Sequence, residues 1–126
     1  MLRESSVIAK KLDRIAVYLK LKSRKYTDES MEVDRVWYLE VPMVGEVPVL
    51  GFEIEASPKP IKYYKGDLNN LHALGCWGVI VLSDKGFSDE LEPTRKKLLK
   101  LVQTQRFPVK ILAESDLDQI IDVLGA

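Results

Sequence analysis

The sequence contains little cysteine and no long hydrophobic run. Its one cysteine, Cys76, excludes an internal disulfide and a zinc site made of several thiolates. No stretch approaches the roughly 18 consecutive apolar residues of a membrane helix, and the N-terminal residues are charged where a signal peptide would be apolar. We therefore expect a cytoplasmic protein that has no membrane partner.

The remaining composition is that of a folded protein. Hydrophobic residues make up 46% of the 126 residues and charged residues 30%, so the chain can bury a core and stay dissolved. No linker, repeat or low-complexity segment divides it. We expect a single domain over residues 1–126.

The net charge of zero hides two oppositely charged segments. Residues 1–26 carry a net charge of +6, and residues 27–56 carry −7. The basic segment could contact a phosphate backbone, and some of the acids could share a cation. The alternative is that both surfaces only face water.

Periodicity predicts the secondary structure. Apolar residues four, three and four positions apart predict a helix within residues 4–22. Residues 32–41 and 47–56 are rich in β-branched and aromatic residues and flank a turn, which predicts an antiparallel hairpin. The expected elements after the hairpin are a helix at 61–74, a strand at 77–83, an amphipathic helix that starts near Pro93, a strand at 108–113 and a helix at 116–124.

This order of elements predicts an α/β fold. Strands that alternate with helices require parallel neighbours with right-handed crossovers, whereas the first hairpin is antiparallel. We expect a three-layer α/β/α sandwich around a mixed central sheet of about four strands.

The hairpin also carries the candidate chemistry. Strand alternation places Glu53 and Glu55 on one face, with the open space of Gly51 beside them, and Asp34 lies on the neighbouring strand. Acids this close repel one another unless a cation lies between them, and hard oxygen ligands suit Mg²⁺ or Mn²⁺. The alternative is an edge strand whose acids face solvent and discourage aggregation.

The same residues resemble a known family, the PD-(D/E)XK nuclease superfamily. The resemblance covers roughly residues 1–83 and includes the order of elements, so it implies a restriction-endonuclease-like fold. The motifs that carry it are VDRVW at 33–37, FEIE at 52–55 and KGDLNNL at 65–71.

The resemblance implies a role for each matching residue. Asp34 and Glu53 correspond to the metal ligands of the family. Glu55 stands where the family usually has lysine, and it is expected to bind the ion or accept a proton. In some members the lysine lies on the following helix, where Lys62 and Lys65 stand here.

A glutamate in the first helix assists the metal in some members of the family, and Glu4 resembles it. The alternative for Glu4 is a first-turn acid that the helix dipole favours.

Three functions remain open at this point. The first is a metal-dependent nuclease that hydrolyses phosphodiester bonds, with DNA as the expected substrate, with Mg²⁺ or Mn²⁺ and no organic cofactor. The second is a catalytically inactive nuclease-like module for nucleic-acid binding or assembly, which the glutamate at position 55 favours. The third is an α/β domain of another function, in which the hairpin acids are incidental.

The nuclease hypothesis carries expectations about partners. Cutting both strands of DNA needs two sites, so we expect a homodimer. Basic residues would offset the repulsion between the acids and phosphate. The lysines expected near the scissile phosphate are Lys59, Lys62 and Lys65, and the residues expected to add affinity are Lys20, Lys22, Arg24 and Lys25.

Overall fold

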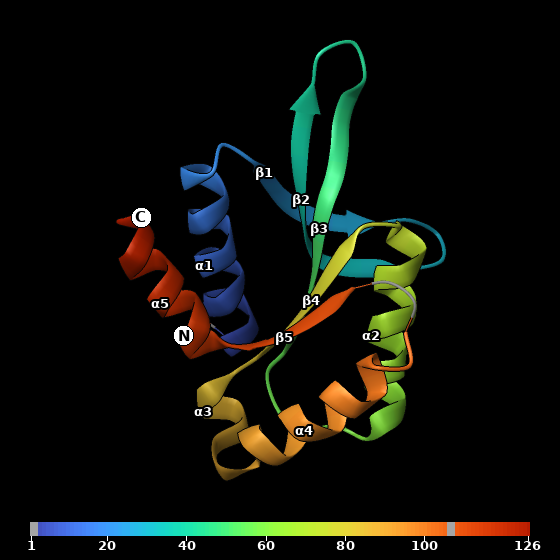
Figure 1. The fold of residues 1–126 in the computed structure, drawn as a ribbon, viewed down its shortest axis with the longest axis vertical. Helices are drawn as coiled ribbons and strands as arrows, with labels where there is room; N and C mark the ends of the chain where they lie inside the picture. Colours follow the sequence, from blue (N-terminus) through green and yellow to red (C-terminus); the bar gives the residue numbers. More distant parts are fainter. Residues whose placement is uncertain (1–2, 106–107) are drawn as a thin grey trace.

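The computed structural model describes residues 3–105 and 108–126 and shows a sheet with helices on both of its faces (Figure 1). The elements, in chain order, are α1 (Glu4–Tyr18), β1 (Lys22–Thr27), β2 (Glu32–Val41), β3 (Gly45–Glu55), α2 (Ile61–Leu74), β4 (Trp77–Leu82), α3 (Asp84–Phe87), the 3₁₀ turn η1 (Ser88–Glu90), α4 (Leu91–Val102), β5 (Val109–Ala113) and α5 (Glu114–Leu124).

The sheet is mixed, as predicted, but it has five strands where the sequence suggested about four. Its order is β1-β2-β3-β4-β5. The β1–β2 and β2–β3 pairs are antiparallel, and the β3–β4 and β4–β5 pairs are parallel. The additional strand is β1, which begins at the residue where the first helix was expected to end.

The first helix ends earlier than its apolar pattern suggests because the chain reverses at Lys20. The backbone of Lys20 has a φ of 61°, and the N–H of Leu21 donates to the carbonyl of Ala16 at 2.8 Å. This bond over five residues closes the last turn of α1 in the manner of a Schellman motif. The chain then enters β1 at the edge of the sheet.

Two hydrophobic clusters lie on opposite faces of the sheet. On one face α1 and α5 pack over side chains that include Trp37 and Phe52, whose ring centroids are 4.5 Å apart. On the other face α2 and α4 pack over side chains that include Val36, Ile80 and Leu82. Burying one such aliphatic or aromatic side chain contributes about 1.5–3 kcal/mol, so both clusters fix the sheet between its helices.

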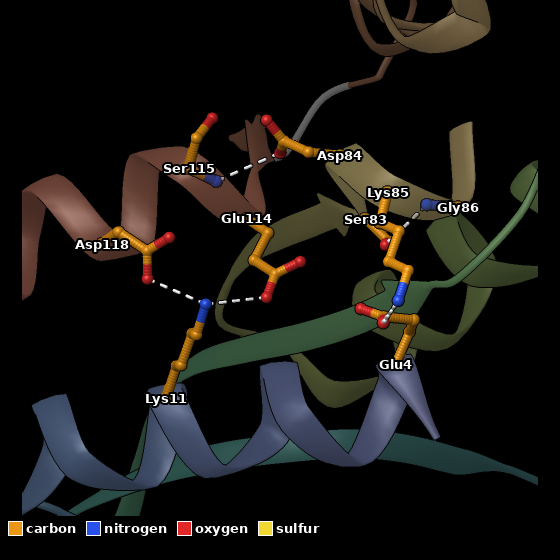
Figure 2. A network of polar contacts seen from close by, with 9 residues as sticks. All are labelled: Glu4, Lys11, Ser83, Asp84, Lys85, Gly86, Glu114, Ser115 and Asp118. Atoms are coloured by element: carbon orange, nitrogen blue, oxygen red, sulfur yellow. Dashed lines mark hydrogen bonds and ion pairs between the residues drawn. The ribbon is translucent and has the colours of Figure 1, made fainter. Parts of the chain in front are cut away.

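A polar network joins α1 to the ends of the parallel strands (Figure 2). The Nζ of Lys11 lies 2.7 Å from a carboxylate oxygen of Glu114 and 2.8 Å from one of Asp118. After β4, the hydroxyl of Ser83 accepts from the N–H of Gly86 at 3.0 Å and caps the short helix α3. The network therefore fixes the position of α1 relative to α5 on one face of the sheet.

No helix within residues 3–105 and 108–126 combines the length and the hydrophobicity that crossing a bilayer requires.

Candidate functional site

The candidate site lies where β2 and β3 separate. Their backbone pairing reaches Arg35 opposite Phe52, and beyond it side chains bridge the two strands. The N–H of Asp34 donates to Oε1 of Glu53 at 3.0 Å, and the N–H of Ile54 donates to Oδ2 of Asp34 at 2.7 Å. We call this gap the fork. The sequence-predicted pair Asp34 and Glu53 is therefore brought together, each carboxylate bonded to the strand of the other.

A β-bulge aims Asp34 into the fork. Between β1 and β2, Arg24 pairs with Val36 and Tyr26 pairs with Val33, so two residues of β2 stand opposite one residue of β1. Val33 and Val36 consequently lie in the same hydrophobic cluster, which regular alternation would forbid. Bulges re-aim side chains in this way, often next to functional sites.

Helix α2 adds two polar side chains that the sequence analysis did not select. The Nδ2 of Asn70 lies 3.5 Å from Oε2 of Glu53 and 3.2 Å from the carbonyl of Glu32. Asp67 interacts with both Glu53 and Glu55. These four carboxyl groups lie close enough for their charges to act on one another, and we call Asp34, Glu53, Glu55 and Asp67 the fork acids.

The fork acids are held in an environment that disfavours their charged forms. Burial, together with the charges of neighbouring acids, raises the pKa of Glu53 to about 7 and that of Asp67 to about 10. Burial is also the main cause that raises the pKa values of Asp34 and Glu55. The fork therefore retains protons near neutral pH.

Lys59, in the loop between β3 and α2, forms an ion pair with one of the fork acids. Its Nζ lies 3.3 Å from Oε2 of Glu55, which is almost fully buried, while the lysine side chain itself is 42% exposed. The N–H of Lys59 donates to the hydroxyl of Tyr64 on α2 at 3.2 Å, which fixes the loop that carries it. Lys59 therefore links the buried acids to the surface.

The two lysines predicted to be catalytic do not reach the fork. The Nζ of Lys62 lies 5.3 Å from the centroid of the Tyr63 ring, and Lys65 lines a hollow toward α4 together with Leu101 and Thr104. Lys65 and Asp67 are two residues apart, which separates them by about 200° around a helix. Since Asp67 faces the acids, Lys65 faces away from them.

The basic residues predicted to bind nucleic acid mostly contact acids of the hairpin. Lys20 lies in the turn after α1, and the other three lie on β1. The ion pairs are Lys22 with Glu40 at 3.3 Å and with Glu46 at 3.2 Å, Arg24 with Glu46 at 2.6 Å, and Lys25 with Glu32 at 3.3 Å. The positive and negative segments of the sequence therefore neutralise each other across β1, β2 and β3.

Asp34 is also reachable from the surface. It lines a cavity of about 370 Å³ with Ser5 and Lys10 of α1, Lys25 of β1 and Arg35 of β2. Three of these four neighbours are basic, so an anionic group can approach Asp34 from this side.

Glu4 does not share that cavity. Its carboxylate lies 3.8 Å from the Nζ of Lys85 (Figure 2), and it lines a separate hollow with Asp84 and Glu114. This position agrees with a first-turn acid of α1, the alternative that the sequence left open.

The fork acids supply oxygen ligands but form no metal site in the described part of the chain. In residues 3–105 and 108–126 no group of three or more His, Cys, Asp or Glu side chains is already arranged around a common metal position. However, Oδ2 of Asp67 is buried and accepts no hydrogen bond in that part of the chain, whereas Oε2 of Glu55 lies 3.3 Å from the Lys59 amine. Carboxylate oxygens of this kind are the ligands that Mg²⁺ and Mn²⁺ prefer.

Comparison with known proteins identifies no relative of this chain. No protein-family model matches the chain, and neither a curated protein nor a solved structure shows significant similarity to it.

Proposed function

We propose that the protein is a metal-dependent nuclease of the PD-(D/E)XK type, with a restriction-endonuclease-like three-layer sandwich. The observation that carries the proposal is the convergence of Asp34, Glu53 and Glu55 at a fork between two strands. Burying three acids together is costly for stability. Such a cost is common where the acids perform a function.

Asp34 and Glu53 would hold Mg²⁺ or Mn²⁺ in this proposal. When bound, the ion neutralises charge on the phosphate and acidifies a water molecule near neutral pH. Both carboxylates are oriented by backbone N–H groups, at 3.0 and 2.7 Å, so little side-chain ordering is needed on binding.

In this proposal Glu55 and Lys59 together would perform the role of the lysine that the family usually carries where Glu55 stands in this chain. A carboxylate with a raised pKa accepts a proton from water near neutral pH. The Lys59 amine, 3.3 Å from Glu55, then places a positive charge beside the reacting phosphate. Lys59 thus replaces Lys65 in the role that the sequence suggested.

DNA is the substrate that we propose. The fork opens beside a cavity with Lys10 in its wall, where a phosphate would compete with Glu32 for Lys25 and with Asp13 for Arg35.

One observation favours a second candidate, a nuclease-like module that binds nucleic acid without cleaving it. Glu55 is paired with Lys59, and no ready-made group of three metal-ligating side chains exists among the described residues. This candidate predicts DNA binding that is independent of divalent ions and no hydrolysis.

Hydrolysis of labelled single-stranded, duplex and branched DNA with Mg²⁺ or Mn²⁺ tests the proposal. We expect cleavage that EDTA abolishes and that Asp34→Asn lowers by about 10³-fold or more. Lys59→Ala should lower the rate by about 10²-fold, whereas Lys65→Ala, the matched control on the far side of α2, should stay within about threefold of wild type. Binding of these DNAs without any cleavage would favour the second candidate.

A further inference from the structure

One face of the β2–β3 hairpin is apolar, and no helix covers it. Figure 1 shows the hairpin extending past the ends of α1 and α5. On this face Leu39 pairs with Val47, and Leu50 pairs with Trp37 on one side and Trp77 on the other. Trp37 and Leu50 belong to the cluster under α1 and α5, but Leu39 is 45% exposed and Trp77 is 55% exposed. The apolar surface of the core therefore continues along the hairpin beyond the helices α1 and α5 that cover the core.

We call this surface the apolar hairpin face. Its members are Leu39, Val47, Leu50 and Trp77 on the strands, Leu19 at the end of α1, and Met43 and Val44 at the hairpin tip. The exposed fractions of Leu19, Leu39, Met43, Val44 and Trp77 add up to about three whole side chains, and one large side chain carries roughly 150–250 Å², so the open area is roughly 500–800 Å². A monomer rarely leaves so large an apolar area in water.

The charged residues of the hairpin lie on its opposite face. Tyr38, which belongs to the cluster under α2 and α4, is the partner of Lys22 in the β1–β2 register. The guanidinium of Arg24 lies 4.1 Å from the centroid of the Tyr38 ring and 2.6 Å from Glu46. These charges are already paired with one another, so they do not select a charged partner.

We propose that the apolar hairpin face is the interface between two copies of this chain. Its strand positions carry no charge, so two such faces meet about a two-fold axis without like charges in contact. Its area is close to the roughly 800 Å² that each partner contributes to a standard interface. The proposal does not depend on nuclease activity.

Sedimentation of the wild-type protein between about 1 and about 100 µM tests the interface. We expect a dimer that Leu39→Glu weakens by about 100-fold or more, because it places a charge inside the buried patch. Leu99→Glu is the matched control, since Leu99 is 44% exposed but lies on α4, on the opposite side of the sheet. This control should remain dimeric with unchanged affinity.

A second measurement needs no variant. Of the two tryptophans, Trp37 is 6% exposed and Trp77 is 55% exposed. Iodide should therefore quench mainly Trp77 in the monomer, and quenching should fall as the protein concentration rises and the dimer forms.

Two results would overturn the proposal. One is a wild-type protein that remains strictly monomeric at about 100 µM. The other is a dimer whose affinity Leu39→Glu does not change. Asp34→Asn should dimerise like the wild type, so a failure of the interface and a failure of the nuclease proposal can be told apart.

Discussion

Replacing Glu53 by glutamine should stabilise the metal-free protein at neutral and alkaline pH. The fold raises the pKa of Glu53 from 4.5 to about 7, first by burial and then through the charge of Asp34. Below pH 4.5 the folded and unfolded chains both hold the Glu53 proton, so the stability that this protonated side chain allows is fully present. As the pH rises through 7, the unfolded chain has released a proton that the folded chain still held, and stability is lost.

The size of the effect follows from the pKa change. A rise from 4.5 to about 7 corresponds to about 3 kcal/mol as an upper bound at pH 8. Rearrangement of the neighbouring acids reduces this penalty, so a gain of about 1–2 kcal/mol is expected, or a rise in Tm of about 3–8 °C. Glutamine keeps the oxygen that accepts the Asp34 N–H at 3.0 Å, so packing is retained.

Thermal unfolding in EDTA at pH 4 and pH 8 measures the gain. Glu46→Gln is the control, because its expected change in stability at pH 8 has the opposite sign. Hydrogen bonds from Arg24 and Lys22 lower the pKa of Glu46 to about 2. Its contribution is present above pH 4.5 and is lost as the pH falls through 2, so this variant should be destabilised at pH 8. The reasoning about Glu53 is refuted if its variant loses stability at pH 8 or gains equally at both pH values.

Two further predictions concern the scaffold. Lys11→Met should destabilise the fold by about 1–3 kcal/mol, because it leaves the largely buried Glu114 without its cation; an unchanged urea midpoint would show that the ion pair contributes nothing. Gly86→Ala should cost more than about 3 kcal/mol, because a Cβ would stand 1.5 Å from the carbonyl oxygen of Ala56. In Gly51→Ala the new Cβ meets the ends of two leucine side chains, Leu74 at 2.8 Å and Leu71 at 3.0 Å, and the substitution should cost less, so equal losses in urea denaturation would contradict this explanation.

Local pattern was sufficient to predict the acidic hairpin. The alternation of β3 and the neighbouring position of Asp34 are properties of single strands, and the structure joins Asp34 to Glu53 as expected. The bulge that turns Asp34 into the fork could not be predicted, because it depends on the register against β1.

Strand β1 itself was missed for a physical reason. The segment Lys22–Thr27 holds three basic residues and no aliphatic one, so neither hydrophobic alternation nor strand propensity marks it. It pairs as a strand at the sheet edge, where its cations contact acids that lie far along the chain. That pairing also explains how the two oppositely charged segments of the sequence come to contact each other at the surface.

The choice between Lys65 and Asp67 also required tertiary structure. Both lie in one motif of α2, and the sequence analysis selected the lysine because the resemblance places a lysine on this helix. The buried positions Tyr64, Leu68 and Leu71 mark the inner face of the helix. Asp67 and Asn70 lie next to that face, and this helical spacing is the signal that could have identified them.

Binding of Mn²⁺ to the fork is the most direct test of the proposed metal site. Loss of the free Mn²⁺ signal in electron paramagnetic resonance measures it at neutral pH, with Asp89→Asn, an exposed acid at η1, as the control. We predict that the wild type and the control bind Mn²⁺ and that Asp34→Asn does not. Binding that survives in Asp34→Asn, or no binding by the wild type at millimolar Mn²⁺, would contradict the proposal that the fork acids hold a catalytic ion.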